Sequence, residues 1–83
     1  MSVYAYYEKV ERKMLKSDLS SQCNGERTVF ILPQIYEGGS VRVYWNGVRQ
    51  IAGTTFSESG TNQISLDFVP QTGDYLTVDY RPI

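Results

Sequence analysis

Apolar and polar residues alternate over most of the chain from residue 27 onward, a period that is typical of β-strands with one buried face. The alternation is strictest in residues 63–68 and 75–80. Turn residues separate these segments from shorter apolar runs at residues 28–32, 41–45, 48–51 and 55–57. No helical pattern interrupts the series, so the sequence predicts a mainly β module, a small antiparallel β-sandwich or barrel, over residues 27–83.

The strongest local signal is a hairpin centred on Asn46-Gly47. Asn-Gly accepts positive φ at both central positions of a type I′ turn, whose twist matches that of the flanking strands. The alternation before the turn predicts that Val43 and Trp45 face the core and that Arg42 and Tyr44 face outward. We interpret Trp45 mainly as a cap on the core, with a ligand contact as the alternative.

The first residues follow a different period, which predicts an amphipathic α-helix within residues 1–18. One face of this helix carries Val3, Tyr7, Val10 and Met14, and the rest is largely basic. The helix either packs on its own domain or docks on another subunit; a membrane surface is least favoured because the apolar face is narrow and Tyr-rich. Residues 19–26 are predicted to be a polar connector, in which Cys23 is interpreted as a bystander.

Composition narrows the possible functions. The chain has 83 residues, one domain at most, and a core of that size is commonly supported by oligomerisation. It has no histidine, a single cysteine and a net charge of -1, which argue against a general-base enzyme and a nucleic-acid binder. No apolar run is long enough to span a bilayer. We therefore expect no enzymatic activity, no cofactor, no nucleic-acid partner and no membrane partner.

Two groups of side chains could still carry chemistry. The carboxylates of Asp67, Asp74 and Asp79 could bind calcium if their loops converged, but their spacing favours solvated charges. Aromatic side chains predicted to be exposed could stack on sugars or form an interface. These are Tyr4, Tyr6, Tyr36, Tyr44 and Tyr75.

The stretch from Phe30 to Tyr80 resembles a small β-module of tailed-bacteriophage virion proteins, found in tail fibres, baseplate parts and head decoration proteins. The resemblance is carried by the hairpin core Asn46-Gly47-Val48-Arg49-Gln50 and the later Pro70-Gln71-Thr72-Gly73-Asp74. Here the module stands alone behind the predicted helix, unlike the repeated modules of long fibres. The resemblance implies a structural role on a virion after synthesis in the host cytoplasm, and it transfers no catalytic residue.

The sequence therefore predicts a phage virion protein that docks by its helix on a capsid, neck or tail protein and self-associates with cyclic symmetry, for example as a trimer. A carbohydrate- or receptor-binding module of a tail fibre, with a host glycan as ligand, is the alternative. An enzyme accessory or inhibitor domain is a third class. Interfaces are rich in Tyr, Met and Arg, which selects as contact residues Tyr4, Tyr7, Val10 and Met14 on the helix and Tyr44 and Arg49 on the module.

Overall fold

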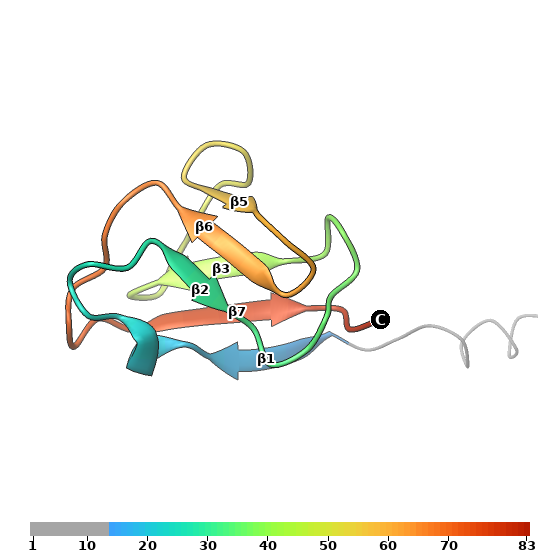
Figure 1. Ribbon diagram of the computed structural model, residues 1–83, viewed down its shortest axis with the longest axis horizontal. Coiled ribbons are helices and arrows are strands. Elements are labelled where there is room, and N and C mark those ends of the chain that lie inside the picture. The colour runs from blue at the N-terminus through green and yellow to red at the C-terminus, as the bar shows by residue number, and fades with distance from the viewer. Residues whose placement is uncertain (1–13) are drawn as a thin grey trace, which may run out of the picture.

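A computed structural model describes residues 14–83, which form two antiparallel β-sheets around one core (Figure 1). One sheet has the strand order β1-β7-β3-β4 and the other the order β2-β6-β5. The elements in chain order are β1 (Leu15–Asp18), the 3₁₀ helix η1 (Ser20–Gln22), β2 (Val29–Ile31), β3 (Arg42–Trp45), β4 (Val48–Arg49), β5 (Phe56–Glu58), β6 (Gln63–Leu66) and β7 (Leu76–Tyr80). The mainly β prediction is confirmed, as the two-sheet sandwich rather than a barrel.

Strand β7 is the centre of the four-stranded sheet, because it pairs with β1 on one side and with β3 on the other. Its inward residues Leu76, Val78 and Tyr80 are all buried. The three-stranded sheet covers them with the buried residues Phe30 and Ile64, which pair with each other across β2 and β6. The apolar residues that alternate along the sequence thus form the inner faces of the two sheets, which pack together as the core.

The Asn46-Gly47 turn has the predicted geometry. Asn46 has φ 50° and Gly47 has φ 84°, so both central residues are left-handed, as a type I′ turn requires. Val43 is buried and Trp45 packs against the core, whereas Arg42 is exposed. The predicted facing of this hairpin is therefore confirmed.

The predicted helix is wrong at its C-terminal end. Leu15–Asp18 form β1, which pairs with β7 from Leu15 opposite Tyr80 to Asp18 opposite Thr77, and residues 14–83 contain no α-helix. The physical reason is long-range: β7 offers a free edge that a strand at residues 15–18 completes, and no local pattern reports that edge. The remainder of the predicted helix lies outside the described residues.

The segment after β1 is also part of the fold rather than a polar connector. Leu19 and Cys23 are both buried in the core, on either side of η1. The Leu19 amide donates to the Leu76 carbonyl at 2.7 Å, which continues the β1–β7 ladder. The β-module therefore begins at Leu15 and not at residue 27, and the predicted boundaries at 18 and 26 do not divide it.

A substitution at Leu76 tests how strongly the stability of the fold depends on the packing of β7. Replacing Leu76, which is 0% exposed, by alanine leaves a cavity between the sheets and should lower the free energy of unfolding by about 2–5 kcal/mol. Urea denaturation followed by circular dichroism measures the change. The matched control is Val48→Ala, which is 61% exposed; equal unfolding midpoints for the two variants would contradict this packing.

Candidate functional site

The outer side of the four-stranded sheet gathers the polar and aromatic side chains that alternate with the core residues. We call it the four-stranded face, made by Lys16, Asp18, Arg42, Tyr44, Arg49, Thr77 and Asp79. Tyr44 lies directly opposite Arg49 on β4 and opposite Thr77 on β7. The structure thus brings together the two contact residues that the sequence selected on the module.

Charges on this face are mixed in sign. Arg42 lies opposite Asp79 in the register, and the Lys16 ammonium is 3.7 Å from the Asp79 carboxylate. The Lys16 side chain is 84% exposed, so this ion pair contributes little to stability. Arg49 is exposed with no ion pair among residues 14–83, which leaves its guanidinium available to a partner.

The other predicted contact residues are placed as follows. Met14 is half-buried directly before β1, while Tyr4, Tyr7 and Val10 lie outside the described residues. Of the remaining aromatic candidates, Tyr75 is 70% exposed, as expected, and Tyr6 also lies outside the described residues. The structure therefore keeps the Tyr44–Arg49 pair together and leaves the N-terminal group as a prediction.

The prediction that the Tyr36 ring is exposed is wrong. Tyr36 is buried, and its hydroxyl donates to the backbone carbonyls of Gly60 and Gln63. Burial, followed by the negative charge of Glu58, raises the pKa of this phenol. Tyr36 therefore ties the loop before β3 to the β5–β6 turn and does not offer a contact surface.

The two motifs that carry the phage resemblance meet at one end of the sandwich. The Trp45 indole donates to the Asp74 carboxylate at 2.9 Å, and the Gln71 amide donates to the same oxygen at 2.9 Å. Beside them, the Tyr75 amide donates to the Asn46 side chain at 2.8 Å. Hydrogen bonds thus join the Asn-Gly hairpin to the Pro-x-x-Gly-Asp loop across the interval of some thirty residues between them.

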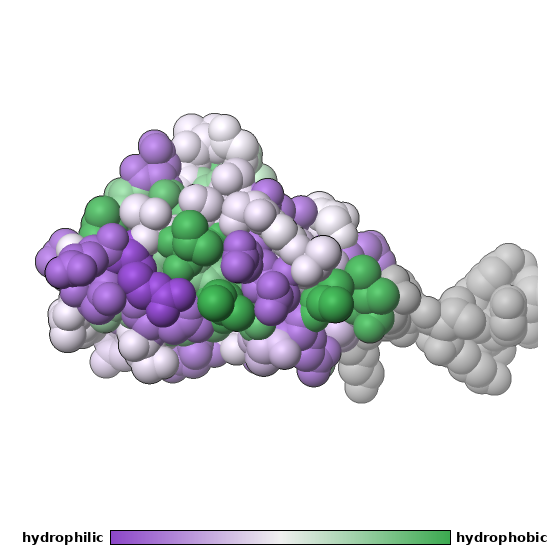
Figure 2. Space-filling view, in the orientation of Figure 1, coloured by the Kyte–Doolittle hydropathy of each residue, from purple (hydrophilic) through white to green (hydrophobic). Residues whose placement is uncertain are grey.

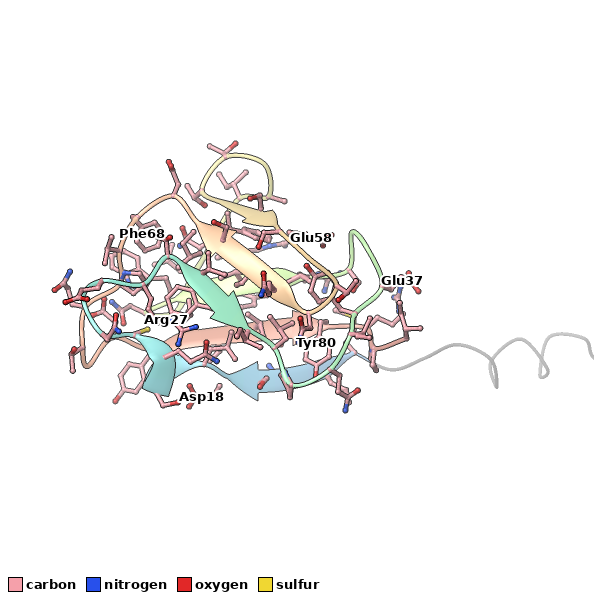
Figure 3. All side chains as sticks on the ribbon, in the orientation of Figure 1. Asp18, Arg27, Glu37, Glu58, Phe68 and Tyr80 are labelled. Carbon is pink, nitrogen blue, oxygen red and sulfur yellow. The ribbon has the colours of Figure 1, made fainter. Side chains whose placement is uncertain are left out.

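Trp45 also covers the core at this end, as the sequence predicted. Its ring meets Phe68 edge to face with centroids 4.9 Å apart, and both rings pack against the buried cluster. Phe68 is labelled in Figure 3 at the end of the sandwich where the loop after β6 runs. The motif residues therefore build the scaffold and leave the neighbouring Tyr44, Arg49 and Tyr75 for contacts.

Cys23 is buried instead of lying in a solvated loop. Its pKa is raised, chiefly by burial and then by the charges of Asp74 and Asp18, which disfavours the reactive thiolate. The described residues hold no group of three side chains suited to a metal, so Asp67, Asp74 and Asp79 do not converge. No helix within residues 14–83 is long and apolar enough to cross a membrane.

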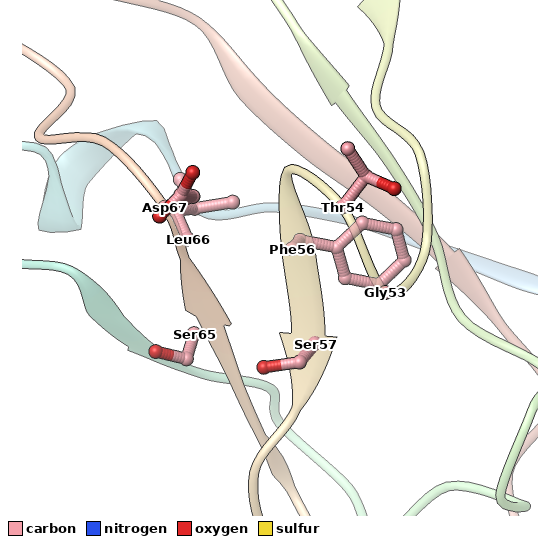
Figure 4. A pocket seen from close by; sticks show the side chains of 7 residues that line it. All are labelled: Gly53, Thr54, Phe56, Ser57, Ser65, Leu66 and Asp67. Atoms are coloured by element: carbon pink, nitrogen blue, oxygen red, sulfur yellow. The ribbon is translucent and has the colours of Figure 1, made fainter.

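A small hollow on the three-stranded sheet was missed by sequence analysis. It encloses about 180 Å³ and is lined by Gly53, Thr54, Phe56, Ser57, Ser65, Leu66 and Asp67 (Figure 4). Ser57 lies opposite Ser65 in the β5–β6 register, so their hydroxyls share one face. The strands were predicted, but their mutual register, which creates the hollow, has no local sequence signal.

Comparison with protein-family models, with curated proteins and with solved structures finds no match to this chain.

Asp74 gives a pH-dependent test of the hairpin-to-loop connection. The Trp45 indole, then the Gln71 amide and the Asn46 side chain, lower the pKa of Asp74 below its ordinary value of 3.8. A depressed folded pKa means that the stabilisation is complete above 3.8 and is lost as the pH falls through the folded value. We expect Asp74→Asn to unfold with a weaker pH dependence than the wild type below pH 3.8.

The fluorescence of Trp45, the only tryptophan in the sequence, reports this transition at the site itself. The matched control is Asp67→Asn, whose carboxylate forms no hydrogen bond to any residue from 14 to 83. Identical acid-unfolding curves for Asp74→Asn and the wild type would show that the indole–carboxylate bond does not hold the loop.

Proposed function

We propose that this chain is a non-enzymatic structural protein of a phage virion. In this proposal the N-terminal segment docks on a capsid, neck or tail protein. The β-sandwich then decorates or cements that assembly, and copies of the chain associate with one another. The observation that carries the proposal is the resemblance of residues 30–80 to phage β-modules, whose two motifs here serve as structural connections.

Some residues of this region hold the scaffold together and others do not, and this difference supports a contact function for the second group. Hydrogen bonds occupy the polar side chains of Trp45, Asn46 and Asp74 and join the hairpin to the loop before β7. Tyr44 and Arg49 lie opposite each other in the β3–β4 register and take no part in these bonds; Arg49 is exposed, and Tyr44, predicted to be exposed, is half-buried. Tyr and Arg combine apolar area with directional hydrogen bonding, and they dominate the energetically important positions of protein interfaces.

The N-terminal segment is the proposed anchor. Its predicted apolar face carries Val3, Tyr7, Val10 and Met14, and its other positions hold more basic than acidic side chains, a pattern suited to an acidic groove on a partner. Met14 stands at the point where this segment joins β1. An anchor at this point would attach the partner directly to the four-stranded sheet through β1.

The test is whether the tagged full-length chain copurifies with virions from infected cells. We expect it to do so, and we expect Tyr44→Ala or Arg49→Ala to reduce binding to the virion about tenfold or more if either residue is a hot spot. The matched control is Val48→Ala, an exposed residue of the same hairpin. Absence of the chain from purified virions would contradict the proposal.

A carbohydrate-binding module is the second candidate, and the hollow of Figure 4 favours it. Thr54, Ser57 and Ser65 offer hydroxyls, and Asp67 offers a carboxylate, groups that pair with sugar hydroxyls. On a glycan array this reading predicts hits that Asp67→Ala removes and that Ser59→Ala, outside the hollow, retains. An array without hits for the full-length chain would reject it.

A further inference from the structure

The chain itself covers three of the sheet edges, in whole or in part, or keeps them very short. At β2, the Gln22 side chain imitates a neighbouring strand: its amide donates to the Ile31 carbonyl at 2.8 Å, and its oxygen accepts the Ile31 N–H at 2.9 Å. The Arg27 guanidinium donates to the Val29 carbonyl on the same edge (Figure 3). These side chains occupy backbone groups that another strand would otherwise use.

The edges at β5 and β4 are limited in other ways. Along β5, Phe56 donates its N–H to the Ile51 carbonyl and accepts from the Gly53 N–H, so the preceding loop covers this edge at Phe56 and leaves only the Glu58 backbone facing outward. Strand β4 has two residues, Val48 and Arg49, which is too short to template a long partner. Among the edges within residues 14–83, β1 therefore keeps the longest open stretch, with two outward-facing residues, Lys16 and Asp18.

The hydrogen-bond pattern between β1 and β7 shows which backbone N–H and C=O groups of β1 point away from β7. Leu19 donates to Leu76, and antiparallel ladders alternate, so Ser17 also directs its backbone groups toward β7. The N–H and C=O groups of Lys16 and Asp18 therefore point outward, and they have no backbone partner within residues 14–83. A shallow hollow of about 370 Å³ lies against this strand, lined by Lys16, Ser17, Asp18 and Thr77.

We propose that β1 pairs antiparallel with β1 of a second copy, about a two-fold axis at Ser17. In this register Lys16 lies opposite Asp18 of the second copy, and each such pair exchanges both backbone hydrogen bonds. The opposite charges then adjoin on the outer face, where directly opposite residues interact most strongly. An axis at Lys16 or at Asp18 would instead set like charges against each other.

Apolar side chains near this edge favour the same occupant. Leu15 faces the core side of β1 yet is 37% exposed, and in the proposed register it lies opposite Leu19 of the second copy. Val29 and Ile31 are exposed on β2, the edge strand of the other sheet, which is drawn above β1 in Figure 1. Figure 2 shows apolar side chains at the surface on this side of the molecule. Pairing would join two four-stranded sheets into one and cover Leu15.

This inference deepens the self-association in the proposed function and depends on no virion partner. A dimer would carry two N-terminal anchors, which raises the effective affinity for an assembly that repeats its docking site. Failure of the pairing would be seen in the mass of the purified protein, whereas failure of the virion proposal would be seen in copurification.

The test is a charge exchange in the full-length chain, read by sedimentation equilibrium. We expect a dimer for the wild type and at least a tenfold weaker dimer for Lys16→Asp and for Asp18→Lys, because each change sets like charges opposite. An equimolar mixture of the two variants should form a heterodimer, since their charges complement. The double variant K16D/D18K should return to a dimer.

Asp18→Asn is the second variant, because it removes the charge but keeps an oxygen to accept the Ser20 N–H, which Asp18 now binds at 2.9 Å. It should weaken the dimer while the circular dichroism spectrum stays unchanged. Glu26→Lys, which makes the same change in charge as Asp18→Lys at an exposed position outside β1, should remain a dimer. A monomeric wild type, or single variants whose mixture stays monomeric, would overturn the proposal.

Discussion

The structure depends on the pairing of β7 along both of its edges. Its inward side chains, Leu76, Val78 and Tyr80, are buried, so they need a sheet wide enough to shield them from water. Its outward-directed backbone groups need hydrogen-bond partners on either side, which β1 and β3 supply. Once this sheet exists, the opposing β2-β6-β5 sheet has one apolar surface to cover, and the remaining elements are connections between the two.

Polar side chains form hydrogen bonds with groups at the sheet edges and loops that the short strands leave without a partner. Gln22 takes the place of a strand beside β2, and Asp74 holds the end of the sandwich by accepting from Trp45 and the Gln71 amide. Each device uses a polar side chain on backbone or indole groups that water would otherwise solvate. In a domain with a small core, such bonds fix the arrangement of loops that few apolar contacts reach. Strand β1 has no comparable device among the described residues, and this difference points to association through β1.

Local features of the sequence predicted much of this architecture. The Asn46-Gly47 turn and the buried alternation of β6 and β7 follow from strand period and turn chemistry, whereas the pairing of Tyr44 with Arg49 was seen only in the structure. Strand β1 was not predictable from local sequence. Residues 15–18 are extended because they pair with the edge of β7, some sixty residues away. Tyr36 and Gln22 belong to the same class: their partners come from distant segments, and composition made both look like surface residues.

The central claim, that β1 is an open edge used for pairing, is tested most directly by amide hydrogen exchange across protein concentration. The account predicts that the Lys16 and Asp18 amides exchange rapidly in dilute protein and become protected as the dimer forms. The Ser17 amide, which faces β7, should be protected at every concentration. Exchange at Lys16 and Asp18 that stays unchanged while the protein dimerises would contradict the account, because the copies would then be joined elsewhere.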